Sequence, residues 1–143
     1  MEYAYTHTED IPVTDLSEIE DVPPDHDIRA IGRALGCQNL SANVWYFQEG
    51  EEIQYHAHAE EEELFYVLDG RFSVKLGRSG EEEIVELDAG SVWAAGPMVG
   101  HGHRCLSEEG TVLAIGAPNV QDPGLDPHEL SDEEIDEALE GDG

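Results

Sequence analysis

A chain of 143 residues, 39% of them hydrophobic, is long enough for one domain with a core but too short for two comfortable domains. Its formal net charge of −28 repels nucleic-acid phosphates and anionic lipid surfaces, so neither a nucleic acid nor a membrane is an expected partner. The sequence contains no apolar run of the roughly 18 residues that span a bilayer, and Cys37 and Cys105 form neither a metal-type pair nor a disulfide framework. We therefore expect a soluble, cytoplasmic protein.

The acidic residues occur in every segment of the chain rather than in one block. This distribution favours a solvated acidic coat of the kind that halophilic proteins use over an acidic docking face for a basic partner. In molar salt the Debye length falls to about 3 Å, which screens the repulsion within such a coat. The composition thus predicts a halophilic protein.

Residues 1–40 are expected to form an extended N-terminal arm that packs on the rest of the domain. The first 27 residues contain many acids and several prolines, no lysine or arginine, and little hydrophobic periodicity. The segment "DIRAIGRALG" (27–36) is compatible either with a helical turn or with a strand and a bend, because its two glycines leave both open.

Between residues 41 and 118 the sequence consists of short runs rich in β-branched and aromatic residues, separated by glycine-containing turns. Regular short strands of this kind predict an all-β sandwich or barrel. The acidic tail, 119–143, is expected to contain a short helix, because Ser131 followed by Glu134 has the pattern of a capping box. The predicted strands are "NVWYFQ", "EIQYHAH", "ELFYVLDG", "RFSVKLG", "EEIVEL", "SVWAAG", "GHGHRCLS" and "TVLAIGAP".

His56 and His58 are two residues apart, so on a strand both imidazoles leave the same face and can converge on one metal ion. In the following run of acids, residues 60–62 fall in a turn and are expected to point to solvent. Glu63 opens the next strand and has the parity of the apolar Phe65 and Val67, so it is expected to point inward. An inward carboxylate is costly unless a cation or hydrogen bonds compensate it, which makes Glu63 the acid with a predicted function.

The spacing of this segment resembles the first conserved motif of the cupin superfamily. It comprises Gly50, His56-x-His58, Glu63 and Gly70 at the intervals of that motif. The later "GSVWAAGPMVGHGHRCLS" resembles the second cupin motif through Gly90, Pro97, Gly100 and His103. The resemblance covers residues 41–118 and implies a double-stranded β-helix, the jelly-roll barrel, with a metal inside it. The ligands that it implies are His56, His58, Glu63 and His103.

His101 is an alternative to His103 as the ligand that closes the site. The two histidines share strand parity, and this second motif has one extra residue before Pro97 and another after it. We favour His103 as the ligand and regard His101 as a candidate acid–base or substrate-contacting residue.

Three imidazoles and one carboxylate suit one divalent transition-metal ion, either Mn, Fe, Co, Ni, Cu or Zn, and the spacing does not choose among them. The resemblance implies an enzyme of the oxidoreductase or isomerase type acting on a small organic molecule, as a dioxygenase, an isomerase or a decarboxylase. The alternatives are a non-catalytic small-molecule-binding or sensor barrel, and a structural barrel with a vestigial site. A homodimer is compatible with the resemblance, since cupin barrels commonly pair.

Overall fold

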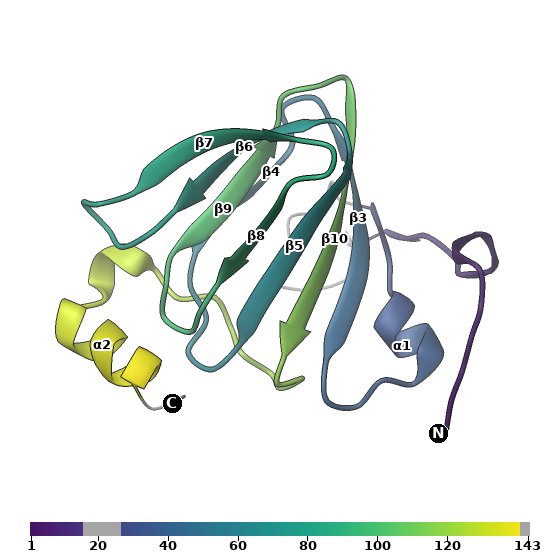
Figure 1. Cartoon of the computed structure of the whole chain (residues 1–143), viewed down its shortest axis with the longest axis horizontal. Helices are drawn as coiled ribbons and strands as arrows, with labels where there is room; N and C mark the ends of the chain where they lie inside the picture. Colours follow the sequence, from purple (N-terminus) through teal and green to yellow (C-terminus); the bar gives the residue numbers. More distant parts are fainter. Residues whose placement is uncertain (16–26, 141–143) are drawn as a thin grey trace.

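The computed structural model describes residues 1–15 and 27–140, in which two antiparallel β-sheets face each other (Figure 1). The six-stranded sheet has the order β1-β2-β3-β10-β5-β8 and the four-stranded sheet the order β4-β9-β6-β7. This is the jelly-roll architecture that the resemblance to cupins implies, and it agrees with the all-β sandwich or barrel that the strand pattern predicts. The strands of the barrel are β3 (Ser41–Gln48), β4 (Glu52–His56), β5 (Glu62–Asp69), β6 (Arg71–Leu76), β7 (Glu83–Asp88), β8 (Val92–Ala95), β9 (His101–Cys105) and β10 (Glu109–Ala117).

Each of the eight predicted runs forms one of these strands, because its β-branched and aromatic residues alternate between the interior and the outer face. Glycines form the tight turns between them. Gly70, which joins β5 to β6, has a φ of 84°, and a Cβ there would lie 2.5 Å from the carbonyl oxygen of Glu109. Only glycine fits this turn without strain.

The core lies between the two sheets and consists of inward-facing side chains of both. On β5, Phe65 and Val67 are 4% and 0% exposed, and Glu63 precedes them on the same inward face. The charged residue therefore sits at the end of an apolar wall. The other members of the buried cluster are Phe47, Phe72, Val74, Trp93, Cys105, Val112 and Ala114.

The N-terminal segment contains a 3₁₀ turn (Thr8–Asp10) and two short strands, β1 (Thr14–Asp15) and β2 (Asp27–Arg29). Strand β2 pairs with β3, and α1 (Ile31–Leu35) follows it and packs on β3. The ambiguous segment 27–36 is thus a strand followed by a helical turn, which ends at Gly36 in the left-handed conformation. The remainder of the expected arm, residues 16–26, lies outside the described residues.

The predicted C-terminal helix is α2 (Asp132–Glu140), preceded by a 3₁₀ turn at Pro127–Glu129. Its capping box is confirmed: the Ser131 hydroxyl accepts from the backbone N–H of Glu134, and the Glu134 carboxylate accepts from the N–H of Ser131. Ile135 is buried, at 2% exposure. Neither helix among residues 1–15 and 27–140 is long and apolar enough to cross a membrane.

Candidate metal site

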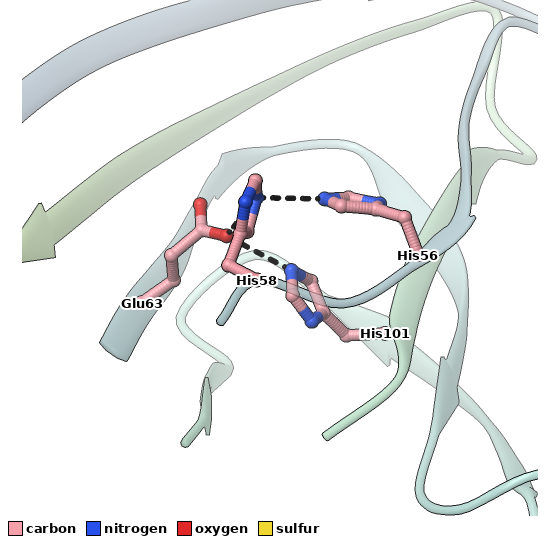
Figure 2. A group of neighbouring side chains, drawn as sticks. All are labelled: His56, His58, Glu63 and His101. Carbon is pink, nitrogen blue, oxygen red and sulfur yellow. Dashed lines mark hydrogen bonds and ion pairs between the residues drawn. The ribbon is translucent and has the colours of Figure 1, made fainter. Parts of the chain in front are cut away.

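Three histidines and one glutamate gather at one end of the barrel (Figure 2). His56 is the last residue of β4, His58 follows it in the turn, Glu63 lies near the start of β5, and His101 is the first residue of β9. Their four ligand atoms all lie within 4.8 Å of one another. The two sheets therefore bring together side chains from three segments that are separated in the sequence.

Glu63 contacts two of the three histidines in this cluster. Its Oε1 lies 2.9 Å from Nε2 of His101 and 3.1 Å from Nε2 of His58. Nε2 of His58 is also 3.1 Å from Nε2 of His56, as the dashed lines in Figure 2 show. All three imidazoles thus direct the same ring nitrogen, Nε2, toward the middle of the cluster.

The other nitrogen of each ring, Nδ1, faces a backbone carbonyl oxygen. The acceptors are Gln54 for His56 at 2.6 Å, Val99 for His101 at 3.0 Å and Asp122 for His58 at 2.8 Å. A carbonyl only accepts, so each Nδ1 must carry the proton, and each neutral ring then has its lone pair on Nε2. Histidines that ligate metals are commonly oriented in this way by a hydrogen bond from the second nitrogen.

The electrostatics of the metal-free cluster show how strongly its members interact. Burial raises the pKa of Glu63, but hydrogen bonds from His101 and His58 outweigh it and hold that pKa well below its usual range. Burial lowers the pKa of His58, yet the hydrogen bond and charge of Glu63 raise it to about 9. For His56, burial and the neighbouring His101 lower the pKa to about 4. In the metal-free protein a proton on His58 would thus lie where a cation would otherwise balance the carboxylate of Glu63.

The structure places His101, and not the favoured His103, in the cluster with His56, His58 and Glu63. The cause is the register between β4 and β9: His101 pairs with His56, whereas His103 pairs with Ile53, beyond a shift in that register. In the connection that leads to His101, Met98 has a φ of 68°, a left-handed conformation. His103 therefore lies one strand repeat deeper in the barrel.

The cluster borders a cavity of about 370 Å³ that opens from the interior of the barrel. Its apolar wall includes Trp45, Ile53, Phe65 and Ala114, and His103 lines it too. No lysine or arginine among the described residues lines it. Cys105 is buried in the core at 1% exposure and is not part of the cluster. A cavity of this size and lining is typical of a small-molecule site.

Asp122 is a residue of this site that the sequence reasoning did not identify. Its carbonyl orients His58, and its carboxylate accepts hydrogen bonds from the backbone N–H groups of residues 59, 60 and 61. These bonds lower the pKa of Asp122 although burial alone would raise it. Of the three acids that directly precede Glu63, Glu60 and Glu62 are exposed, as expected. Glu61 is instead half-buried, and its burial together with the nearby charge of Glu63 raises its pKa.

A family model described as "Cupin domain" matches residues 43–116, which is more than half of the chain. The chain belongs to the cupin family. The resemblance of its two motifs to those of cupins is thereby confirmed, and so is the jelly-roll fold that it implies. A search of curated proteins finds no match to this cupin.

Solved structures with the same fold are similar to this cupin at low sequence identity. The structure of KdgF from Halomonas sp. has a TM-score of 0.67 at 21% identity, over 82% of this chain and 96% of the other. An RmlC-like cupin from Shewanella frigidimarina has a TM-score of 0.65 at 22% identity, over 85% and 97%. A sugar phosphate isomerase of the cupin superfamily from Silicibacter pomeroyi gives 0.61 at 16% identity, over 80% and 75%.

A larger protein also contains this fold. A mutant of the oxalate decarboxylase OxdC from Bacillus subtilis matches with a TM-score of 0.64 at 18% identity, over 94% of this chain and 36% of the other. The structural neighbours of this cupin therefore include isomerases and decarboxylases. At these identities the likeness shows the fold alone.

Proposed function

We propose that this cupin holds one divalent transition-metal ion on His56, His58, Glu63 and His101 and acts on a small organic molecule in the adjoining cavity. The observation that carries this proposal is the common orientation of the three imidazoles. Each Nδ1 faces a backbone carbonyl, so three Nε2 lone pairs and one carboxylate oxygen meet in one small volume. Such a set of donors repels itself unless protons or a metal ion lie among them, and a metal ion satisfies all four donors at once.

The donor set fits Mn, Fe, Co, Ni, Cu or Zn, and lacks a thiolate. When bound, the ion would supply Lewis-acid chemistry, polarising an oxygen atom of the substrate, or would bind dioxygen beside it. The protein itself provides the rest of the site. The carbonyls of residues 54, 99 and 122 fix the imidazoles, and the apolar wall of Trp45, Ile53 and Phe65 limits the access of water to the bound molecule.

The lining of the cavity narrows the class of substrate. A phosphate group requires cationic or multiple N–H donors, and the described residues offer no lysine or arginine there. The net charge of −28 further disfavours a multiply charged anion. We therefore propose a substrate that is neutral or carries a single carboxylate, which the ion would hold. Isomerase, decarboxylase and dioxygenase types remain the candidate reactions.

The metal site is tested by elemental analysis of protein purified without chelator and without affinity nickel. We expect about one transition-metal ion per chain. His101→Ala and His103→Ala form a matched pair, because both remove an inward imidazole from β9 and only the first removes a proposed ligand. His101→Ala should lose the metal and His103→Ala should keep it. Loss of metal from His103→Ala alone, or a wild type that takes up none of the six ions, would overturn the ligand set.

The catalytic part of the proposal is tested separately from metal binding. The metal-loaded protein is incubated with a panel of small hydroxy acids, keto acids, sugars and sugar phosphates, and the products are followed by nuclear magnetic resonance. Turnover of an unphosphorylated substrate that His101→Ala abolishes would support the proposal. Stoichiometric metal and tight binding of a panel member without any product would instead favour the non-catalytic binding barrel.

A further inference from the structure

The four-stranded sheet, β4-β9-β6-β7 in Figure 1, has a hollow of about 290 Å³ on its outer face. On β6, Phe72 and Val74 are 0% exposed and point into the core, so the alternate residues Ser73 and Lys75 lie on the outer face. Both of these residues line the hollow, and so does Arg104 of β9. The hollow and the cavity at the metal cluster therefore lie on opposite faces of this sheet, with β4 and β9 between them.

An irregularity in the pairing of β4 with β9 shapes the hollow. The register between the two strands shifts between Ile53 and His56. Two residues of β4, Gln54 and Tyr55, therefore oppose Gly102 alone, which is a β-bulge. A Cβ at Gly102 would lie 2.9 Å from the carbonyl oxygen of Ile53 and 2.9 Å from the backbone nitrogen of Tyr55. The bulge thus requires glycine at this position and leaves the floor of the hollow without a side chain.

Two of the six basic residues of the chain, Lys75 and Arg104, line this hollow. In the pairing of β6 with β9, Lys75 lies opposite Gly102 and Arg104 lies opposite Ser73. The two cations are therefore diagonal neighbours on adjacent strands, at a separation of about 7 Å that long side chains bridge. Both charged groups can thus reach one small molecule in the hollow.

Within residues 1–15 and 27–140, neither Lys75 nor Arg104 forms an ion pair. The ammonium of Lys75 instead lies over the ring of Tyr55, 4.5 Å from its centroid. Arg71, on the same face of β6, does pair with a carboxylate, that of Glu86. In a chain with 34 acids, two cations that line one hollow without an acidic partner are an exception, and a bound anion would explain it.

We propose that this hollow binds a small anion with two negative charges, either a phosphoryl group or a dicarboxylate. The guanidinium of Arg104 can pair with two oxygen atoms of such a group, and the ammonium of Lys75 supplies the second charge. Ser73 and Gln54 add a hydroxyl and an amide to the lining. Glu52 is the one acid among the described lining residues, and it is exposed. This inference does not depend on the proposed metal site.

The net charge of −28 opposes an anion over the whole surface, so a binding site for one needs cations of its own. At about 0.15 M salt the Debye length is about 8 Å, so Lys75 and Arg104, in contact with the anion, act on it more strongly than distant acids do. The cavity at the metal cluster has no lysine or arginine in its described lining. We therefore assign the doubly charged anion to the hollow and not to that cavity.

Inorganic phosphate, malonate and acetate are the probes that test the hollow. At mildly alkaline pH, phosphate and malonate carry two negative charges and acetate carries one. Binding is measured by calorimetry at one fixed ionic strength, and by the shift of the NMR amide signal of Gly102, which reports on the floor of the hollow. We expect at least one of the two dianions to bind one to one, and acetate to bind about tenfold more weakly because it engages only one of the two cations.

Three variants locate the bound anion. Lys75→Gln and Arg104→Gln each remove one charge from the hollow, and each should weaken binding of the dianion by about tenfold. Arg71→Gln is the matched control, because it removes the same charge from the same face of β6 at a residue that does not line the hollow. The affinity of the Arg71→Gln protein should lie within about twofold of wild type. All three side chains lie on the outer face of the sheet, so the variants should fold.

Each outcome of this experiment decides the proposal. Stronger binding of phosphate would identify a phosphoryl group as the ligand, and stronger binding of malonate would identify a dicarboxylate. Equal weakening by all three substitutions would show a diffuse attraction to positive charge and would overturn the site, as would the absence of binding of both dianions in calorimetry and in the Gly102 signal.

The variants also separate this inference from the proposed function. Neither Lys75 nor Arg104 belongs to the metal cluster or lines its cavity. A dianion whose affinity is unchanged in Lys75→Gln and in Arg104→Gln would therefore bind elsewhere, for example to the ion of the proposed metal site. The hollow would then be wrong while the metal site stands. Conversely, loss of dianion binding in both variants of a protein that takes up no metal would support the hollow although the metal site fails.

Discussion

Asp122 and His58 are 64 positions apart in the sequence, and two different parts of Asp122 determine where His58 lies. The carbonyl oxygen of Asp122 is 2.8 Å from Nδ1 of His58. Its carboxylate accepts the N–H groups of Ala59 and Glu60 at 3.0 and 2.8 Å, and that of Glu61 at 2.9 Å. One residue thus shapes the turn that follows His58 and also orients the ring. The segment after β10 is therefore part of the candidate metal site although it contributes none of the proposed ligands.

Asp122→Ala should weaken metal binding without removing any proposed ligand. The substitution deletes three hydrogen bonds to the 59–61 turn, so both the turn and the Asp122 carbonyl should shift relative to His58. Loss of an outer hydrogen bond to a ligating histidine typically reduces metal affinity by about 10- to 100-fold. Competition with a chromogenic chelator measures the change.

Asp126→Ala is the matched control for this substitution. Asp126 lies in the same segment and its carboxylate also accepts a backbone N–H, that of His128, but it makes no described contact with the cluster. The metal affinity of the Asp126→Ala protein should equal that of wild type. Equal affinities of wild type and Asp122→Ala would show that the turn does not orient His58.

The metal-free protein should lose stability as the pH rises from 6.5 to 9. The pKa of His58 is raised to about 9 from 6.5 by Glu63, so the protonated ring stabilises the fold fully below pH 6.5. This contribution disappears as the pH rises through 9, and its size is about 3 kcal/mol. Urea unfolding of chelator-treated protein at pH 6.5 and 9.5 measures it.

The same experiment has two controls. Glu63→Gln removes the carboxylate that raises the pKa of His58, so its stability should change much less over this range. In the metal-loaded protein a cation replaces the proton, and the dependence should likewise diminish. A metal-free wild type that is equally stable at both pH values would contradict the ion pair between His58 and Glu63.

The barrel could be predicted from the sequence because its signals are local. The alternation on β5, where Glu63, Phe65 and Val67 share one face, is visible in "ELFYVL", and the structure confirms that all three point inward. The turn glycines mark where each strand ends, as Gly70 does. The capping box at Ser131 is equally local. Each of these features depends on residues that are only a few positions apart in the sequence.

The choice between His101 and His103 could not be predicted in this way. Both have the same parity, so only the pairing of β9 with β4 decides which one meets His56, and that pairing contains a register shift. No local sequence pattern marks Asp122 as part of the site, because an acid in the acidic tail cannot be distinguished from the other acids of the predicted surface coat. The pairing register of distant strands and the packing of distant segments could therefore not be predicted from the sequence.

Ile135→Ala should destabilise the protein by about 2–4 kcal/mol, the usual effect of removing a buried aliphatic side chain. Ile135 is 2% exposed and is the buried residue of α2. Ile84→Ala makes the same chemical change at 66% exposure on β7, and should have an effect of at most about 0.5 kcal/mol. Chemical denaturation of the two variants gives the difference. Similar losses from both would show that α2 is not packed against the barrel in solution.

The acidic coat predicts that the protein is more stable in concentrated salt. A net charge of −28 on one small domain destabilises the compact state by self-repulsion, and molar salt screens that repulsion over a Debye length of about 3 Å. The melting temperature should therefore rise by more than about 10 °C between 0.05 and 2 M potassium chloride, since each kcal/mol corresponds to about 2–8 °C. Sucrose at matched osmolality is the control, because it stabilises by exclusion from the surface without screening charge. A melting temperature that is unchanged by potassium chloride, or raised equally by sucrose, would contradict the prediction that the acids act as a salt-dependent coat.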